Sequence, residues 1–292
     1  MADTALFAPP IPPIPPGELS LLRFLRAIRT NALTMWPAAA YEQPVRSRRL
    51  FGRTTMLLND PTAIHRVLVD NPGNYRRSPA SVRILRPITG NGLLLSEGED
   101  WKLQRRTIAP ALAPRVMPML ARHIAVVADE TVALLTAQSD RPVNLLAVME
   151  GAALQIAGQS MFSLEMGSYG QELRTHITEY GMRWARPHLL DLLLPPTIPT
   201  LRDLFRRRFQ TRWMRLIERI MQARLQAPPA EDARDLFDLL LTARDPETGR
   251  GFSHDQLRDQ TATMMLAGHA TTAVTLFWSL VLLCGAPAEQ QL

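Results

Sequence analysis

The sequence predicts a mainly α-helical fold with a small β-hairpin near the N-terminus. First, apolar residues recur at helical spacing through most of the 292 residues. Second, two short extended runs, 48–50 and 54–58, flank a glycine in the pattern of a hairpin. Third, 46% of the residues are hydrophobic and 21% are charged, which is a globular composition and excludes disorder throughout.

Residues 1–17 are a proline-rich arm, and residues 18–292 are expected to form one domain. The arm has no long apolar run, so it does not have the pattern of a secretory signal peptide. The prolines that punctuate it favour an extended, polyproline-like conformation.

A single cysteine, Cys284, limits the chemistry of the chain. It excludes an internal disulfide, zinc fingers and cysteine-held iron–sulfur clusters, because the latter two need several thiolates. A chain without disulfides suits a reducing compartment, so we expect a cytoplasmic location.

Caps and breakers set the elements of the first third. Asp60 and Pro61 pair a capping side chain with a proline in the first turn, which predicts a helix that ends near Asp70. The prolines and glycines of 79–92 predict a loop-rich stretch. Ser96 and Glu99 have the spacing of a capping box, which would start the next helix.

Helical periodicity defines the other long elements. A turn at 245–249 and a capping box formed by Ser253 and Gln256 precede the last of them. The expected helices cover residues 19–33, 115–137, 145–162, 169–185, 201–225 and 254–284.

The helix over 201–225 carries eight arginines against two acidic residues. Its apolar stripe includes Leu201, Leu204, Phe205, Phe209, Trp213, Leu216, Ile217 and Ile220. A basic face can dock an acidic protein, a membrane surface or nucleic acid. The aromatic residues belong to the apolar stripe and not to the arginine face, which disfavours nucleic acid. A solvated surface helix is the favoured interpretation.

No charged residue occurs from Gln260 to Ala288, a run long enough to cross a bilayer. Several threonines and His269 make its first half polar, and a histidine is costly in lipid. A central helix buried on all sides of a helical domain has the same uncharged pattern. We therefore expect a buried helix and no membrane span.

Within this run, Ala267, Gly268, Thr271 and Thr272 share one helical face, and His269 points away from it. The two small residues leave room for a flat group, and the Thr271 hydroxyl can reach the Ala267 carbonyl four residues back. The alternative is helix packing through small residues.

Trp101 and Arg105 are four residues apart and share a helical face. The indole N–H and the guanidinium are both donors, so both can point at one anion. The alternative is a core tryptophan beside a surface arginine.

The order of these two motifs, and the hairpin and helices before them, resemble the cytochrome P-450 superfamily of haem-thiolate monooxygenases. The resemblance runs from about Arg48 to the end of the chain. The family motif W-x-x-x-R reads Trp101-Lys102-Leu103-Gln104-Arg105. The family motif A/G-G-x-D/E-T-T/S reads Ala267-Gly268-His269-Ala270-Thr271-Thr272.

The resemblance implies a role for each matched residue. Trp101 and Arg105 would bind the haem propionates, and Ala267 and Gly268 would clear space beside the porphyrin. Thr271, with Thr272, would be catalytic on the oxygen side and help to deliver protons. The segments 79–93 and 183–199 would border the substrate pocket.

The resemblance also implies the reaction and its partners. Such an enzyme uses O2, haem iron and electrons from NAD(P)H, relayed by an electron-donor protein of the ferredoxin or flavodoxin type, to hydroxylate an apolar small-molecule substrate. The basic helix and the arginines near Lys102 would be candidates for docking the donor. No nucleic acid is expected as a partner.

The chain departs from the family pattern in two ways. Ala270 stands where the motif has an acidic residue. The family's E-x-x-R helix and cysteine loop have no match, and the surroundings of Cys284 are not those of the axial ligand, so no metal ligand is assigned. We therefore expect an incomplete cytochrome P-450 fold, from a fragment that forms no stable thiolate-ligated haem by itself.

Three other functions stay open at this point. The chain could be a non-catalytic helical remnant that binds a partner or ligand, or a single-span membrane protein anchored through residues 260–288. A nucleic-acid binder is the least favoured.

Overall fold

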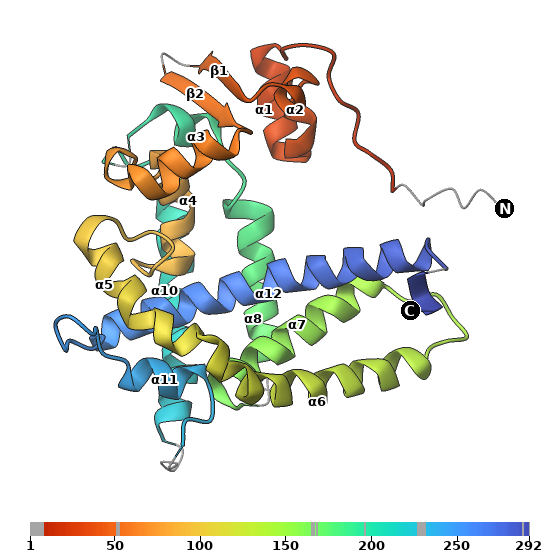
Figure 1. Ribbon diagram of the computed structural model, residues 1–292, viewed down its shortest axis with the longest axis vertical. Helices are drawn as coiled ribbons and strands as arrows, with labels where there is room; N and C mark the ends of the chain where they lie inside the picture. The colour runs from red at the N-terminus through yellow and green to blue at the C-terminus, as the bar shows by residue number, and fades with distance from the viewer. Residues whose placement is uncertain are drawn as a thin grey trace. The chain divides into compact units, whose positions relative to one another are not determined.

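The computed structural model describes residues 9–50, 53–164, 167, 169–195, 197–226, 232–287 and 289–291. These residues are mainly helical and include a two-stranded antiparallel sheet, so the predicted fold class is confirmed. The chain divides into two compact units (Figure 1). Among the described residues, one unit holds those of 10–85 and 181–204, and the other holds Pro9 and those of 86–180 and 205–291.

The smaller unit contains the hairpin and the short helices. The hairpin is longer than predicted, with Val45 paired to Leu58 at one end and Leu50 to Arg53 at the other; the glycine of its turn lies outside the described residues. The elements are α1 (Leu21–Thr30), α2 (Ala39–Glu42), β1 (Val45–Leu50), β2 (Arg53–Leu58), α3 (Pro61–His65), α9 (Leu189–Leu193) and the first half of α4 (Pro79–Thr89).

Arg48 attaches the hairpin to the segment around α1. Its guanidinium donates to the carbonyl of Leu19 at 3.0 Å and lies over the ring of Phe24, 4.6 Å from the centroid. Asp60 caps α3 as predicted, since its carboxylate accepts from the Ala63 amide at 2.7 Å.

The expectation of a loop over 79–92 was wrong for most of that stretch, which forms α4. Pro79 occupies the first position, where no amide bond is needed, and Pro87 lies in the last turn. Ile84 and Ile88 are buried. The apolar contacts of this helix therefore outweigh its two prolines.

The larger unit is a bundle of long helices. Helix α7 packs along α12 and also against α6 (Figure 1). Phe162 of α7 is fully buried and lies 5.7 Å, between ring centroids, from Phe237 of α11. The helices are α5 (Gly98–Ile108), α6 (Met117–Thr136), α7 (Leu145–Phe162), α8 (Gly170–Glu179), α11 (Leu236–Thr242), α12 (His254–Cys284) and, from Phe205 onwards, α10 (Leu201–Leu225).

Helix α10 has the predicted bounds, but its two faces differ from the prediction. Arg206 and Arg224 are buried, so the arginines do not form one solvated face. The apolar stripe is buried only from Phe209 onwards, and Leu201 is 78% exposed. Trp213 anchors the helix, because its indole N–H donates to the Ile88 carbonyl at 2.7 Å.

One predicted capping box is confirmed and the other was wrong. Ser253 and Gln256 cap α12 reciprocally. Helix α5 begins at Gly98 with no side-chain cap. The Ser96 hydroxyl is instead directed inward, to the Gln104 side chain at 3.2 Å.

Helix α12 is only partly buried. Its first half buries Leu257, Ala262 and Met265, whereas in its second half Val274 and Trp278 are exposed. By length and composition alone, α7 and α12 could each cross a membrane, as could the bent pair Gly98–Leu112 and Pro114–Thr136 if it is counted as one span; only the described residues were considered. The absence of a membrane span therefore stays a prediction.

Candidate functional site

The first predicted pair lies on α5. Trp101 is half-buried, Arg105 is exposed one turn later, and the guanidinium carbon is 5.4 Å from the centroid of the indole ring. Within the part of the chain that the structure describes, neither donor group has a hydrogen-bond acceptor or an ion-pair partner. The pair is thus free to donate to an anion that lies on this face of α5.

The second predicted set lies on α12, on an open face. Ala267 and Thr271 are exposed, and a Cβ added at Gly268 would meet no atom within 4 Å. The Thr271 hydroxyl donates to the Ala267 carbonyl at 2.5 Å, as predicted, and the Thr275 hydroxyl donates to the Thr271 carbonyl at 2.9 Å. Thr272, the fourth predicted residue, is half-buried. Ala267, Gly268 and Thr271 therefore present small side chains and one hydroxyl to an open surface on which a flat group could lie.

His269 lies on the other side of α12. It is buried against α7, and its Nε2 is 3.2 Å from the carbonyl of Glu150, so Nε2 must carry the donated hydrogen. Burial lowers the pKa of His269, which keeps the ring neutral near pH 7. The histidine of the motif thus packs the helix and does not face the open side.

A buried amide pair connects α5 to α12. The side-chain amide of Gln260 donates to Gln104 Oε1 at 2.6 Å, and Gln104 Nε2 donates to the carbonyl of Asn91 at 3.1 Å. The amide of Leu93 donates to Gln260 Oε1 at 3.0 Å. Gln104 and Gln260 are buried and Leu93 is half-buried, whereas Asn91 is exposed. These bonds fix the connection between α4 and α5 to the first half of α12.

Two glycines let this connection approach α12 closely. Gly90 has a φ of +60°, and a Cβ there would overlap the Asp259 carboxylate, which accepts from the Asn91 amide at 2.8 Å. A Cβ at Gly92 would overlap the Thr263 hydroxyl. Both positions need a residue without a side chain.

A second bridge, formed by Arg106, also holds the C-terminal half of α5. The Arg106 guanidinium donates to both carboxylate oxygens of Asp245, at 2.8 and 3.2 Å, and the Thr248 hydroxyl donates to Asp245 at 2.7 Å. The bond from Arg106, and then that from Thr248, hold the pKa of the Asp245 carboxyl far below its ordinary value. The turn before α12 is therefore tied to the helix that carries Trp101 and Arg105.

Sequence reasoning missed Gln104, Arg106 and Gln260. The sequence signal that could have indicated Gln104 and Gln260 is an amide side chain on a helix that is expected to be buried. For Arg106 the sequence holds no comparable signal, because its partner Asp245 lies 139 positions later and the local pattern there predicts only a turn.

Hydrogen bonds and an ion pair connect α5, which carries Trp101 and Arg105, to α12 and the turn before it. The predicted residues of the two helices, all of which the structure describes, are not joined directly. Among the described residues, no hydrogen bond, ion pair or ring contact links Trp101 or Arg105 to the set from Ala267 to Thr272. Gln260, which holds α5, precedes Thr271 by eleven residues, which is about 16 Å along a helix.

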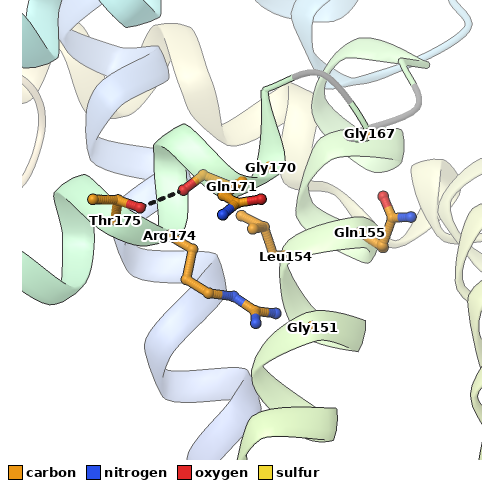
Figure 2. A pocket seen from close by; sticks show the side chains of 8 residues that line it. All are labelled: Gly151, Leu154, Gln155, Gly167, Gly170, Gln171, Arg174 and Thr175. Carbon is orange, nitrogen blue, oxygen red and sulfur yellow. Dashed lines mark hydrogen bonds between the residues drawn. The ribbon is translucent and has the colours of Figure 1, made fainter.

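A surface hollow of about 490 Å³ lies elsewhere, between α7 and α8. Figure 2 shows the Arg174 side chain reaching from α8 toward Gly151 of α7; Gln155 and Gln171 also line the hollow. None of the residues that sequence analysis selected lines this hollow. It is therefore not the predicted site.

Comparison with known proteins adds a family to this geometry. A family profile described as cytochrome P-450 matches residues 12–291. Cyclooctat-9-en-7-ol 5-monooxygenase of Streptomyces melanosporofaciens is 29% identical over 210 residues, covering 70% of this chain and 44% of that protein. Cyclooctatin synthase of the same organism is 29% identical over 248 residues, covering 83% of this chain and 52% of that protein.

A solved structure, the cytochrome P450DA heme domain, has a similar fold. It aligns with a TM-score of 0.73 and 20% identity, over 95% of this chain and 61% of that chain. The chain spans about half the length of the curated relatives it matches.

Proposed function

Because this chain belongs to the cytochrome P-450 family, we propose that it carries the propionate-binding and oxygen-side residues of a haem monooxygenase. The observation that carries the proposal is the pair on α5, in which two adjacent donors, Trp101 and Arg105, share a face and have no acceptor among the described residues.

The residues present fit a haem in two respects. A haem has two carboxylates at one edge, and an indole N–H beside an arginine suits such anions. It also has a flat face, and the Ala267 and Gly268 surface of α12 is open, with free space where a glycine Cβ would be. When bound, the haem supplies the oxidation chemistry at its iron.

We assign the proton-handling role to Thr271, with Thr272 beside it. The Thr271 hydroxyl is exposed on the open side and donates its hydrogen to the Ala267 carbonyl. Its oxygen can still accept a hydrogen bond, but it can pass on its own hydrogen only by turning away from that carbonyl. Ala270 offers no carboxylate, and His269 is neutral and turned toward α7. Water is therefore the group from which Thr271 would be resupplied.

We further propose an apolar organic substrate and electrons from NAD(P)H through a ferredoxin- or flavodoxin-type donor. The printed name of one relative, a monooxygenase of cyclooctat-9-en-7-ol, supports a largely hydrocarbon substrate. Exposed arginines of α10, such as Arg207, Arg208 and Arg215, are the basic residues left for docking an acidic donor, since Arg206 and Arg224 are buried. A cytoplasmic location without nucleic acid as a partner completes the proposal.

Haem titration of the chain with matched variants tests the assignment. Arg105→Gln removes one charge-assisted donor, so it should weaken haem binding by about tenfold. Lys102→Gln, on the same helix, removes the same charge from a side chain that pairs with Glu99 and should leave the affinity unchanged. Absorbance of the bound haem reports both; equal affinities for all three proteins would contradict the proposal.

A further inference from the structure

Arg83 of α4 makes an unusual set of contacts within the smaller unit. Its Nη2 donates to the carbonyls of Pro195 and Ile198, both at 2.6 Å, and its Nη1 donates to the carbonyl of Leu190 at 3.3 Å. All three carbonyls lie within residues 185–200, part of the connection between α8 and α10, of which the structure describes 185–195 and 197–200. This segment lies more than 100 positions after Arg83 in the sequence. Only 4% of the Arg83 side chain is exposed.

The start of α10 completes the arrangement. Arg83 Nε is 3.8 Å from the Asp203 carboxylate, and Asp203 in turn accepts from the amide and the hydroxyl of Thr200, at 2.7 and 2.9 Å. One side chain of α4 therefore holds the connection at its short helix, at its end and at the first turn of the helix that follows.

Buried apolar side chains hold this connection only in part, because several of its apolar residues are exposed. Leu190, Leu193 and Ile198 are 45%, 39% and 48% exposed. Hydrogen bonds to Arg83 are different from apolar contacts, because water can replace them on both partners when the segment lifts, and their net worth is modest. The connection is therefore held by bonds that can be exchanged for water.

We propose that Arg83 is the positioning residue that fastens residues 185–200 to α4, and that its release lets this connection open. Under the proposed function, the connection borders the substrate pocket, so the fastener would set how readily an apolar substrate enters. That consequence rests on the proposed function; the fastening itself does not.

Local amide exchange tests the fastener without haem or substrate. Arg83→Met removes the donors, and Arg86→Met is the matched control, since Arg86 is an exposed arginine of the same helix three residues later. The reporting amides are those of Leu192, Leu194 and Ile198, which are hydrogen-bonded within the connection. We expect their exchange to be about tenfold faster or more in Arg83→Met, because each lost bond came from a charged donor.

The outcomes distinguish two roles for Arg83: holding residues 185–200 to α4, or stabilising the whole chain. Faster exchange confined to 185–203, unchanged exchange in Arg86→Met and partial recovery in Arg83→Lys support the proposal. Unchanged exchange in Arg83→Met, or faster exchange throughout the chain in both Arg83→Met and Arg83→Lys, would overturn it. The local effect beside equal haem affinities for the parent chain, Arg105→Gln and Lys102→Gln would contradict the proposed function and leave the role of Arg83 standing.

In haem-loaded protein, the association rate of an apolar ligand gives the functional readout. It should rise in Arg83→Met and not in Arg86→Met, while the haem affinity stays the same. An unchanged association rate beside a confirmed local opening would remove the role in substrate entry.

Discussion

At the scale of single residues, the geometry of the site depends on atoms that are absent as much as on those present. Gly90 and Gly98 both have a positive φ, +60° and +59°, and they lie at the two ends of the connection that leads into α5. Around Gly98 there is open space, whereas at Gly90 the Asp259 carboxylate occupies the position of a Cβ. The same substitution should therefore have different consequences.

We expect Gly98→Ala to lower the free energy of unfolding by about 1–2 kcal/mol, the cost of a left-handed backbone for a residue with a Cβ. Gly90→Ala carries the same cost and adds a clash of about 1–3 kcal/mol, because the Asp259 carboxylate must leave the Asn91 amide. Urea unfolding of both variants measures the difference. Equal losses would show that the connection adapts and does not depend on this close approach.

At the scale of elements, the arginines of α10 divide into two kinds. Arg224 is 4% exposed in its side chain and pairs with Asp235 at 2.9 Å and with Asp238 at 2.6 Å, which joins the end of α10 to the start of α11. Arg219 is 55% exposed and pairs with Glu172 of α8 at 2.6 Å. The distances are similar, and burial is what differs.

Arg224→Met should therefore cost about 3–5 kcal/mol of unfolding free energy, because it leaves the buried Asp235 carboxylate without its counter-charge. Arg219→Met, the same change five residues earlier, should cost less than about 1 kcal/mol. Denaturant unfolding of the two variants makes the comparison. A loss at Arg219 as large as that at Arg224 would mean that exposed pairs hold α10 in place.

The helices also show which structural features can be predicted from the sequence. The bounds of α7, α10 and α12 were predictable, since long periodic runs and the Ser253 cap report the local backbone. The buried state of Arg206 and Arg224 was not, because periodicity places every arginine in solvent, and only partners distant in sequence can bring one inside. Helix α4 was missed for the same reason: its prolines are visible locally and its buried contacts are not.

In the candidate site too, local patterns were predictable and long-range contacts were not. The donors on α5 and the small-residue face of α12 were predictable as patterns, and the Thr271 bond to Ala267 is local to one helix. The Gln104–Gln260 bond and the Arg106–Asp245 bridge join residues more than 130 positions apart. The local spacing of residues in the sequence therefore cannot predict either contact. What the sequence leaves out is the support that orients the site.

At the scale of the whole molecule, the second half of α12 presents exposed apolar side chains. Val274, Trp278 and Leu282 form a stripe at four-residue spacing and are 47%, 44% and 43% exposed. An apolar stripe of this kind in water favours association with another apolar surface. The same stripe in lipid would face acyl chains, and α12 has the length and composition for a span.

We predict that the chain stays in the aqueous fraction and self-associates through this stripe. The triple variant Val274→Ser, Trp278→Ser and Leu282→Ser should then be monomeric at concentrations at which the parent chain sediments as a dimer or larger species, because it removes the apolar surface that association would bury. Cys284, exposed at the end of α12, adds a local readout. A polar maleimide should label it more slowly in the associated parent chain than in the variant. Retention of the parent chain in the membrane pellet after an alkaline wash would refute this prediction and favour a bilayer span for α12.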